Sequence, residues 1–174
     1  MKAKIFILFF IIFLTGCKKE DDFLINPDQE IYFQVVGLNY AWIFRHAGWM
    51  IDSAGAVRGY NLPKVWNWVD SLGYITNSKM KENIEQLDTT FTKIERDTLE
   101  KYINKIYKAS KGPITDPVTQ MFDAGTARYT AYLYNSRTQK YKEVIIKQIG
   151  DQFIDNKSLE ANQIYNWLIR SRQE

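Results

Sequence analysis

The stretch that decides the fold is ARYTAYLYNSRTQKYKEVIIKQI, residues 127–149. Alternate residues of its first part share one face of an extended chain, and these are Ala127, Tyr129, Ala131 and Leu133. The polar segment 135–139 favours a turn, and the β-branched residues 144–146 favour a return strand over Tyr141–Ile149. The sequence therefore predicts an antiparallel hairpin over residues 127–149.

A second hairpin is predicted nearer the N-terminus. Ile31–Val36 is rich in strand-forming residues, and Tyr40–Asp52 is mostly aromatic and aliphatic. Asp52-Ser53-Ala54-Gly55 is typical of a turn, because Asp accepts hydrogen bonds from turn amides and Gly supplies a positive φ. Ala56–Tyr60 is then the expected return strand.

Apolar residues at helical spacing mark four further segments, which begin at Leu62, Ser78, Asp97 and Ser158. Asp97, in a capping box, and Ser158 are the predicted N-caps of the last two. In the first, Pro63 suits the first position of a helix and Gly73 suits its end. In the second, threonines weaken the periodicity, so residues 89–94 are predicted either as helix or as extended chain. Hairpins separated by helices predict an α+β fold, in which an antiparallel sheet carries helices packed on one face.

The N-terminal segment is typical of a secretory signal. Two lysines precede the apolar run 5–14, which is too short to cross a bilayer as a helix because about 20 residues are needed. We therefore expect a signal peptide over residues 1–16, an acidic tether over residues 17–29 and a single globular domain over residues 30–174.

The end of that signal, Leu14-Thr15-Gly16-Cys17, resembles the lipobox of bacterial lipoproteins. The resemblance implies cleavage before Cys17, lipidation of its sulfur and acylation of the new amino terminus. One acyl chain binds a membrane only marginally, whereas two or three chains give a stable anchor. The alternative is an ordinary signal peptide that happens to end beside a cysteine.

The residues after the cysteine bear on localisation. Lys18 occupies the place where an aspartate would resemble an inner-membrane retention signal. Lys19-Glu20-Asp21-Asp22 resembles the acidic export signal of some surface lipoproteins of Gram-negative bacteria, and the alternative is a solvated spacer. We therefore expect an anchor in the outer membrane of a bacterium, with exposure at the cell surface as the further expectation.

A second resemblance links residues 132–168 to uncharacterised bacterial surface lipoproteins. The matching positions are Gly150-Asp151, Asn156, Ser158, Ala161 and Trp167-Leu168, with Asn39-Tyr40-Ala41-Trp42, Gly48-Trp49 and Asp52 upstream. No activity is attached to that family, so the resemblance implies no mechanism.

Composition excludes several kinds of function. Without the two lysines of the signal, 21 basic side chains face 20 acidic ones, so the charge gives no reason to expect nucleic acid binding. His46 is the one histidine and Cys17 the one cysteine, which excludes a closed Cys/His zinc site and a disulfide. We expect no cofactor and no bound metal.

His46 lies in the segment with the most potentially functional residues, Arg45–Asp52. It could act as a general base, but Asp52 lies about 20 Å further along an extended strand. An orienting carboxylate would have to come from elsewhere in the chain, with Asp123 and Asp151 as candidates, and the alternative is a partly buried histidine bonded to the backbone. Asp123, Asp151 and Asp155 could form a carboxylate pair for glycoside cleavage. Asp123 and Asp151 lie beside glycines, however, where aspartates usually make turns.

Tryptophans are the other candidate contacts. Trp66 and Trp68 are two residues apart on a predicted helix, so they point in different directions. The apolar stripe places Trp66 inward and leaves Trp68 as a contact for a sugar or a partner, whereas core packing is expected for Trp42 and Trp49. The candidate contacts are Arg45, His46, Trp49, Asp52, Trp68, Asp123 and Asp151.

These features favour a non-enzymatic, lipid-anchored envelope or cell-surface protein that binds a macromolecule or glycan, or joins an envelope assembly. The expected partners are the membrane, through acyl chains on Cys17, and an envelope protein or a glycan. Two alternatives stay open. One is an extracytoplasmic hydrolase that uses carboxylates with or without His46, and the other is an inhibitor or immunity-like protein that pairs through a strand edge.

Overall fold

The computed structural model describes residues 26–41, 43–88 and 90–171. In chain order its elements are β1 (Ile31–Asn39), β2 (Arg45–Asp52), β3 (Ala56–Asn61), β4 (Tyr74–Thr76), α1 (Asn77–Ile84), β5 (Thr90–Lys93), α2 (Arg96–Ala109), β6 (Val118–Thr119), β7 (Thr126–Asn135), β8 (Lys140–Gly150), β9 (Gln152–Asp155) and α3 (Leu159–Leu168). The predicted signal peptide, Cys17 and most of the predicted tether lie outside the described residues, as does Trp42.

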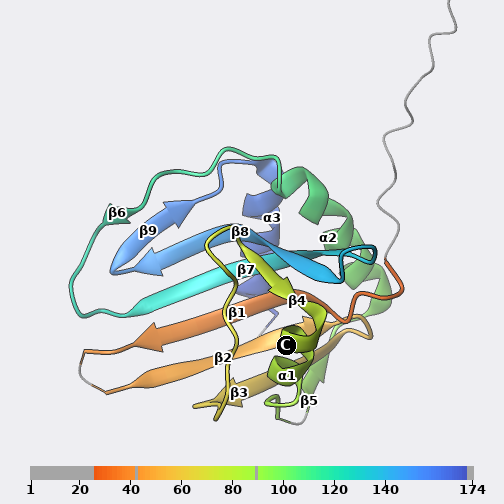
Figure 1. Cartoon of the computed structure of the whole chain (residues 1–174). Coiled ribbons are helices and arrows are strands. Elements are labelled where there is room, and N and C mark those ends of the chain that lie inside the picture. The colour runs from red at the N-terminus through yellow and green to blue at the C-terminus, as the bar shows by residue number, and fades with distance from the viewer. Residues whose placement is uncertain (1–25, 42, 89, 172–174) are drawn as a thin grey trace, which may run out of the picture.

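The strands form an antiparallel sheet in the order β5-β3-β2-β1-β7-β8-β9-β6, and β4 pairs with β8 outside this order (Figure 1). The prediction of an α+β fold built on an antiparallel sheet is confirmed. The predicted hairpins are β2–β3 and β7–β8. The two strands that end the order are short, since β5 has four residues and β6 has two.

The turn between β2 and β3 forms as its sequence predicts. Oδ1 of Asp52 accepts hydrogen bonds from the amides of Ala54 and Ala56, each at 2.9 Å. Gly55 has a φ of 82°, and a Cβ there would lie 2.4 Å from the carbonyl oxygen of Ile94. Glycine is therefore needed both for the turn conformation and for the close approach of the neighbouring chain.

One side of the sheet, which we call the helix face, is covered by α2 and α3 (Figure 1). Phe33, Ile51 and Val57 from three neighbouring strands are fully buried there. The helices contribute the apolar stripes predicted from the sequence, namely Leu99, Ile103 and Ile106 from α2 and Ala161, Ile164, Trp167 and Leu168 from α3. This core therefore forms where the apolar stripes of two amphipathic helices pack against the sheet.

The opposite side, which we call the strap face, is covered by α1 and by residues 62–73, which we call the strap. Its core consists of Ile31, Val36, Met50, Tyr60, Ile75, Met80, Leu87, Tyr132, Tyr134 and Tyr141. The prediction that helices pack on one face describes α2 and α3, whereas α1 contributes Met80 to this second core. The difference arises because β4, directly before α1, pairs with β8 and leads the chain over the strap face.

The prediction of a helix over residues 63–72 is wrong, because the strap is irregular. Oδ1 of Asn83 accepts a hydrogen bond from the Asn67 amide at 2.7 Å, and Nδ2 of Asn83 donates to the Asn67 carbonyl at 2.8 Å. Oδ1 of Asp70 accepts from the amides of Leu72 and Tyr74, each at 2.9 Å. Side chains bonded to the backbone in this way compete with helical hydrogen bonds.

The helix predicted from Ser78 is shorter and begins earlier. Its N-cap is Thr76, and it ends at Ile84. Residues 90–93 form β5, so the extended alternative is confirmed there. The threonines of that segment favour a strand over a fourth helical turn.

The predicted caps of the two longer helices have different outcomes. The predicted N-cap Asp97 lies inside the first turn of α2, because the structure places the N-cap at Glu95. The prediction for α3 is confirmed, since Oγ of Ser158 accepts a hydrogen bond from the amide of Ala161 at 3.1 Å.

Candidate functional site

The helices cover only part of the helix face, as the strand registers show. The row Val57, Ile51, Phe33, Ala131 and Val144 crosses β3, β2, β1, β7 and β8 beneath α2 and α3. Next to it lies a border row, Gly59, Trp49, Val35, Tyr129 and Lys147. This row is two residues further along β3, β2, β1 and β7 and three along β8, because the β7–β8 register shifts there. Beyond it is the row Asn61, Ala47, Gly37, Ala127 and Ile149, which the core does not include.

This outer part of the face forms a groove of about 830 Å³. Its floor is made of residues with little or no side chain, namely Gly37, Ala47, Gly59 and Ala127. Phe91 of β5 lies on one side, and Gln120 and Met121 of the β6–β7 connection lie on the other. A Cβ at Gly37 would meet its nearest neighbour at an ordinary 3.6 Å, so the hollow there follows from missing side chains rather than from tight packing.

The dimensions of the groove limit what could bind there. Between Phe91 of β5 and the β6–β7 connection, residues from the five adjacent strands β3, β2, β1, β7 and β8 line it. Strands lie about 4.8 Å apart, so this part is about 19 Å wide. A shallow surface of this width suits a polymer or a protein segment better than a small molecule, which is usually enclosed.

The groove and the first described residue lie at opposite ends of the sheet. Asn26 donates a hydrogen bond from Nδ2 to the carbonyl of Tyr134, near the end of β7, and its own carbonyl accepts from Oη of Tyr32. The groove instead involves residues 35–39, at the far end of β1 (Figure 1). β1 has nine residues, which is about 30 Å of extended chain.

A second concavity of about 440 Å³, which we call the acidic pocket, adjoins the groove. It is lined by Leu38, Asn39, Tyr40, Ala41, Asp123, Gly125, Thr126, Gln148 and Asp151. Oδ1 of Asp151 accepts a hydrogen bond from the amide of Ala124 at 2.8 Å, whereas Asp123 is exposed on the loop. The structure thus brings two of the predicted site residues, Asp123 and Asp151, to one pocket.

Exposed apolar side chains gather in the two connections beside these concavities. The set, which we call the apolar end, is Tyr40, Ile43, Phe44, Met121 and Phe122, with exposed fractions from 50% at Met121 to 87% at Phe122. The rings of Tyr40 and Phe44 lie 5.4 Å apart. Large apolar side chains left in water beside a groove are typical of a surface that is covered by a partner.

His46 lies on the strap face and is only 6% exposed. Its ring stacks on Trp68 at 5.1 Å and meets the edges of Tyr60 at 5.5 Å and Trp66 at 5.3 Å. Burial lowers the pKa of His46 below its ordinary value, and its Nε2 has no hydrogen-bond partner among the described residues. The ring therefore serves as a neutral member of an aromatic cluster.

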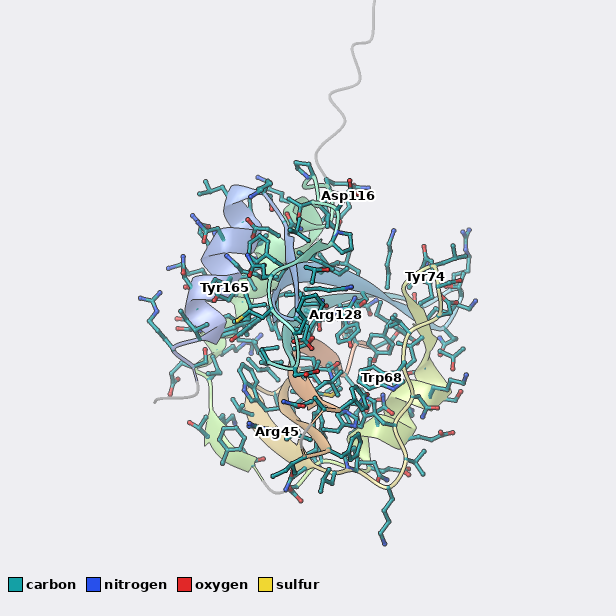
Figure 2. The ribbon with its side chains drawn as sticks, turned by 90° about the vertical axis from the view of Figure 1, so that its left-hand side faces the viewer. Arg45, Trp68, Tyr74, Asp116, Arg128 and Tyr165 are labelled. Carbon is teal, nitrogen blue, oxygen red and sulfur yellow. The ribbon has the colours of Figure 1, made fainter. Side chains whose placement is uncertain are left out.

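Trp66 and Trp68 keep the orientations predicted for them although the helix is absent. Trp66 packs against the strap-face core, and Trp68 is 47% exposed. Because one side of Trp68 is stacked on His46, the other side remains open to solvent. Trp68 is thus an accessible ring, and Figure 2 labels it on the strap side of the molecule.

A buried polar network lies between these strands on the strap face. Nε2 of Gln34 donates to Oη of Tyr60 at 2.9 Å, and Oη of Tyr132 donates to Oε1 of Gln34 at 2.5 Å. Arg128 and Glu143 form an ion pair at 2.6 Å. Burial raises the pKa of Glu143, and the positive charge of Arg128 opposes that shift. Nε of Arg128 is buried without a hydrogen-bond partner among the described residues. The one acid of the network, Glu143, is paired with Arg128, so the network fixes the strands rather than offering a free acid or base.

The other predicted site residues have separate positions. Trp49 is 5% exposed and belongs to the helix-face core, as expected from core packing. Arg45 is exposed and lines the groove. The side chain of Asp52 accepts two hydrogen bonds, and both of them hold the β2–β3 turn. Within the described part of the chain, no three His, Cys, Asp or Glu side chains gather closely enough to hold a metal ion.

The sequence reasoning missed the floor of the groove. Gly37, Ala47 and Ala127 fall in segments that were predicted or confirmed as strands, and small residues in a strand carry no chemical signature. A usable signal was their pairing, because Gly37 faces Ala47 on one side and Ala127 on the other. That register only becomes known once β1 is placed between β2 and β7.

No protein-family model, no curated protein and no solved structure matches the chain. Among the described helices, none has both the length and the apolar content needed to cross a membrane.

Proposed function

We propose that this protein is a lipid-anchored binding module of the bacterial envelope. Acyl chains on Cys17 hold it in the outer membrane, and the groove of the helix face takes a macromolecule or glycan. The observation that carries the proposal is that the groove and Asn26 lie at opposite ends of the sheet. A tether that leaves from the Asn26 end directs the groove away from the membrane that holds the anchor.

The length of the tether agrees with this orientation. Residues 17–25 precede Asn26, and an extended chain of nine residues reaches about 30 Å. The charged residues at positions 18–22 keep such a segment in water. The domain can therefore stand clear of the lipid surface and present its far end to large ligands.

Binding has more support than hydrolysis. A hydrolase needs two acids, or His46 and an acid, within hydrogen-bonding reach of a substrate. The ring contacts of His46 are aromatic, Asp52 is used in a turn, and Asp155 is paired with Lys147 and Lys157. Asp123 and Asp151 share the acidic pocket, but Asp151 there holds the Ala124 amide of the loop. The strand-edge alternative has only short terminal strands to use.

The binding role can be tested by photo-crosslinking in intact cells. The photoreactive residue p-benzoylphenylalanine replaces Phe91 or Gln120 at the sides of the groove, and Leu159, which is exposed at the start of α3, provides the control position. We expect a discrete adduct, identified by mass spectrometry, from the two groove positions and none from Leu159. Absence of an adduct, or the same adducts from all three positions, contradicts the proposal.

The anchor is tested separately by metabolic labelling with an alkyne analogue of palmitate. Cys17→Ser removes the acceptor sulfur, so we expect an unlabelled and unprocessed chain. Thr15→Ser is the matched control, because it keeps a small hydroxylated residue at that position and should be labelled normally. An unlabelled wild-type protein with a free thiol at Cys17 would show that the anchor does not exist.

A further inference from the structure

The groove and the acidic pocket adjoin at one end of the sheet. Both are lined by the same four residues, Leu38, Asn39, Gly125 and Thr126, at the adjoining ends of β1 and β7. The floor of the groove lies on the helix face, whereas Leu38 packs against the strap-face core. Figure 2 looks onto this end of the sheet, with Arg45 labelled near it, Tyr165 on the helix side and Trp68 on the strap side. A single extended ligand therefore reaches both concavities by passing around this end of the sheet.

The glycines at this junction fix its shape. A Cβ at Gly150 would lie 2.0 Å from the carbonyl oxygen of Gly125, and a Cβ at Gly125 would lie 2.5 Å from that of Leu38. The amide of Asp151 also donates to the Gly125 carbonyl at 2.8 Å. The backbones here are packed too closely for side chains, so the passage from the groove to Asp151 is a fixed part of the fold.

The chemistry of the apolar end favours protein over glycan. Its members include the aliphatic Ile43 and Met121, which gain nothing from the hydroxyl groups of a sugar. Apolar area removed from water contributes about 25 cal/mol per Å², and only an apolar partner removes it efficiently. Aromatic residues and methionine are also the types enriched at the centre of protein interfaces.

The charge of the acidic pocket specifies one feature of that partner. Asp123 and Asp151 are its charged lining residues, and neither forms an ion pair within the described part of the chain. Leu38 and Tyr40 provide apolar surface beside them, which suits the long stem of a lysine or arginine. The complement is thus a positive charge on a flexible apolar chain.

The described residues leave the groove and the acidic pocket open, and Asn26 lies at the opposite end of the sheet. We infer that the groove binds an extended apolar segment of a partner protein, and that a lysine or arginine of the same segment enters the acidic pocket. The inference rests on the proposed binding function and specifies its partner.

The test uses the full-length lipidated protein in detergent micelles, probed with a phage-displayed library of random dodecapeptides. We expect enrichment of peptides that combine aromatic or aliphatic residues with a lysine or arginine. Selected peptides are then synthesised with a fluorescent label, and their affinities are measured by anisotropy. Ala47→Phe fills the groove, and Leu159→Phe adds the same ring at an exposed position outside it.

Three variants decide the result. Ala47→Phe should weaken binding of the selected peptides at least about tenfold, whereas Leu159→Phe should leave it unchanged. Asp123→Asn combined with Asp151→Asn should weaken binding about threefold and remove the preference for lysine or arginine. The unfolding transition of each variant is recorded, so that a misfolded protein is recognised.

Other outcomes overturn the inference. Peptides that bind Ala47→Phe as well as wild type do not use the groove, and peptides without a basic residue contradict the role of the acidic pocket. Concentration-dependent self-association that Ala47→Phe abolishes would make a second copy of the chain the occupant. If no peptide is enriched while the crosslinks described above join the groove to a glycan, this inference fails and the proposed function stands. If neither peptides nor crosslinks are found, both fail.

Discussion

The two faces of the sheet are covered by different means. On the helix face, two amphipathic helices bury an apolar core, and their limited length leaves the groove open. On the strap face, an irregular segment and a short helix cover a core rich in tyrosines, beside which lie a buried histidine and a partly buried ion pair. One sheet thus combines a helix face with an apolar core and a strap face that is also held by specific polar contacts.

The largest expected effect is on the helix face. Phe33 is fully buried and its ring meets the Trp167 ring edge-on at 5.0 Å. Phe33→Ala leaves a cavity beneath both helices and should lower the free energy of unfolding by about 3–5 kcal/mol, measured by urea denaturation. Phe91→Ala, at a half-exposed position beside the groove, should change it by less than about 0.5 kcal/mol. Equal losses would show that the groove is part of the core.

The next comparison separates the covered and open parts of the helix face. Ala131 has no exposed surface, so Ala131→Phe overpacks the core and should destabilise by about 1–3 kcal/mol. Ala47→Phe places the same ring in the groove and should leave stability within about 0.5 kcal/mol of wild type. Thermal unfolding of the two variants measures the difference. A similar loss from both would mean that the groove is closed in solution.

A third variant addresses the strap. Asn83 is 2% exposed and holds both the amide and the carbonyl of Asn67. Asn83→Ala leaves those two backbone groups without this partner and should cost about 1–3 kcal/mol. The rate of backbone amide hydrogen exchange should rise within residues 62–73 and stay unchanged in α2 and α3. Asn166→Ala, at an exposed position of α3, is the control.

Faster exchange throughout the molecule in Asn83→Ala would contradict this picture. It would mean that the strap and the helix face unfold as one cooperative unit rather than separately.

The smallest expected effect depends on pH. Burial lowers the pKa of His46 in the folded protein, so the unfolded chain binds more protons below its own value of about 6.5. The contribution of His46 to stability is therefore present above that pH and is lost as the pH falls through the lower, folded value. Urea denaturation from neutral to mildly acidic pH should show wild type losing stability relative to His46→Gln. Parallel curves for the two proteins would contradict the shift.

The helix face and the strap face also differ in how much the sequence reveals. The stripe of α3 and its Ser158 cap depend on neighbours within one or two turns, so local spacing was enough to predict them. The β2–β3 turn is likewise set by Asp52 and Gly55 alone. In each case the residues that decide the structure lie close together in the sequence.

The strap shows why the rest could not be predicted. Trp66 and Val69 have helical spacing, but they pack, partly buried, against the strap-face core, and Asn83 from α1 holds the backbone between them. The groove depends in the same way on where α2 and α3 stop and on which strands flank β1. Both depend on contacts between distant segments, which a single sequence does not display.

The short terminal strands have a consequence for the lipid anchor proposed above. Proteins anchored in the same leaflet meet sideways far more often than molecules free in solution, and a long open β-edge would let them polymerise. β5 offers four residues and β6 only two, which is too little backbone to template another strand. Under the proposed anchoring, crowded copies would therefore stay separate from one another.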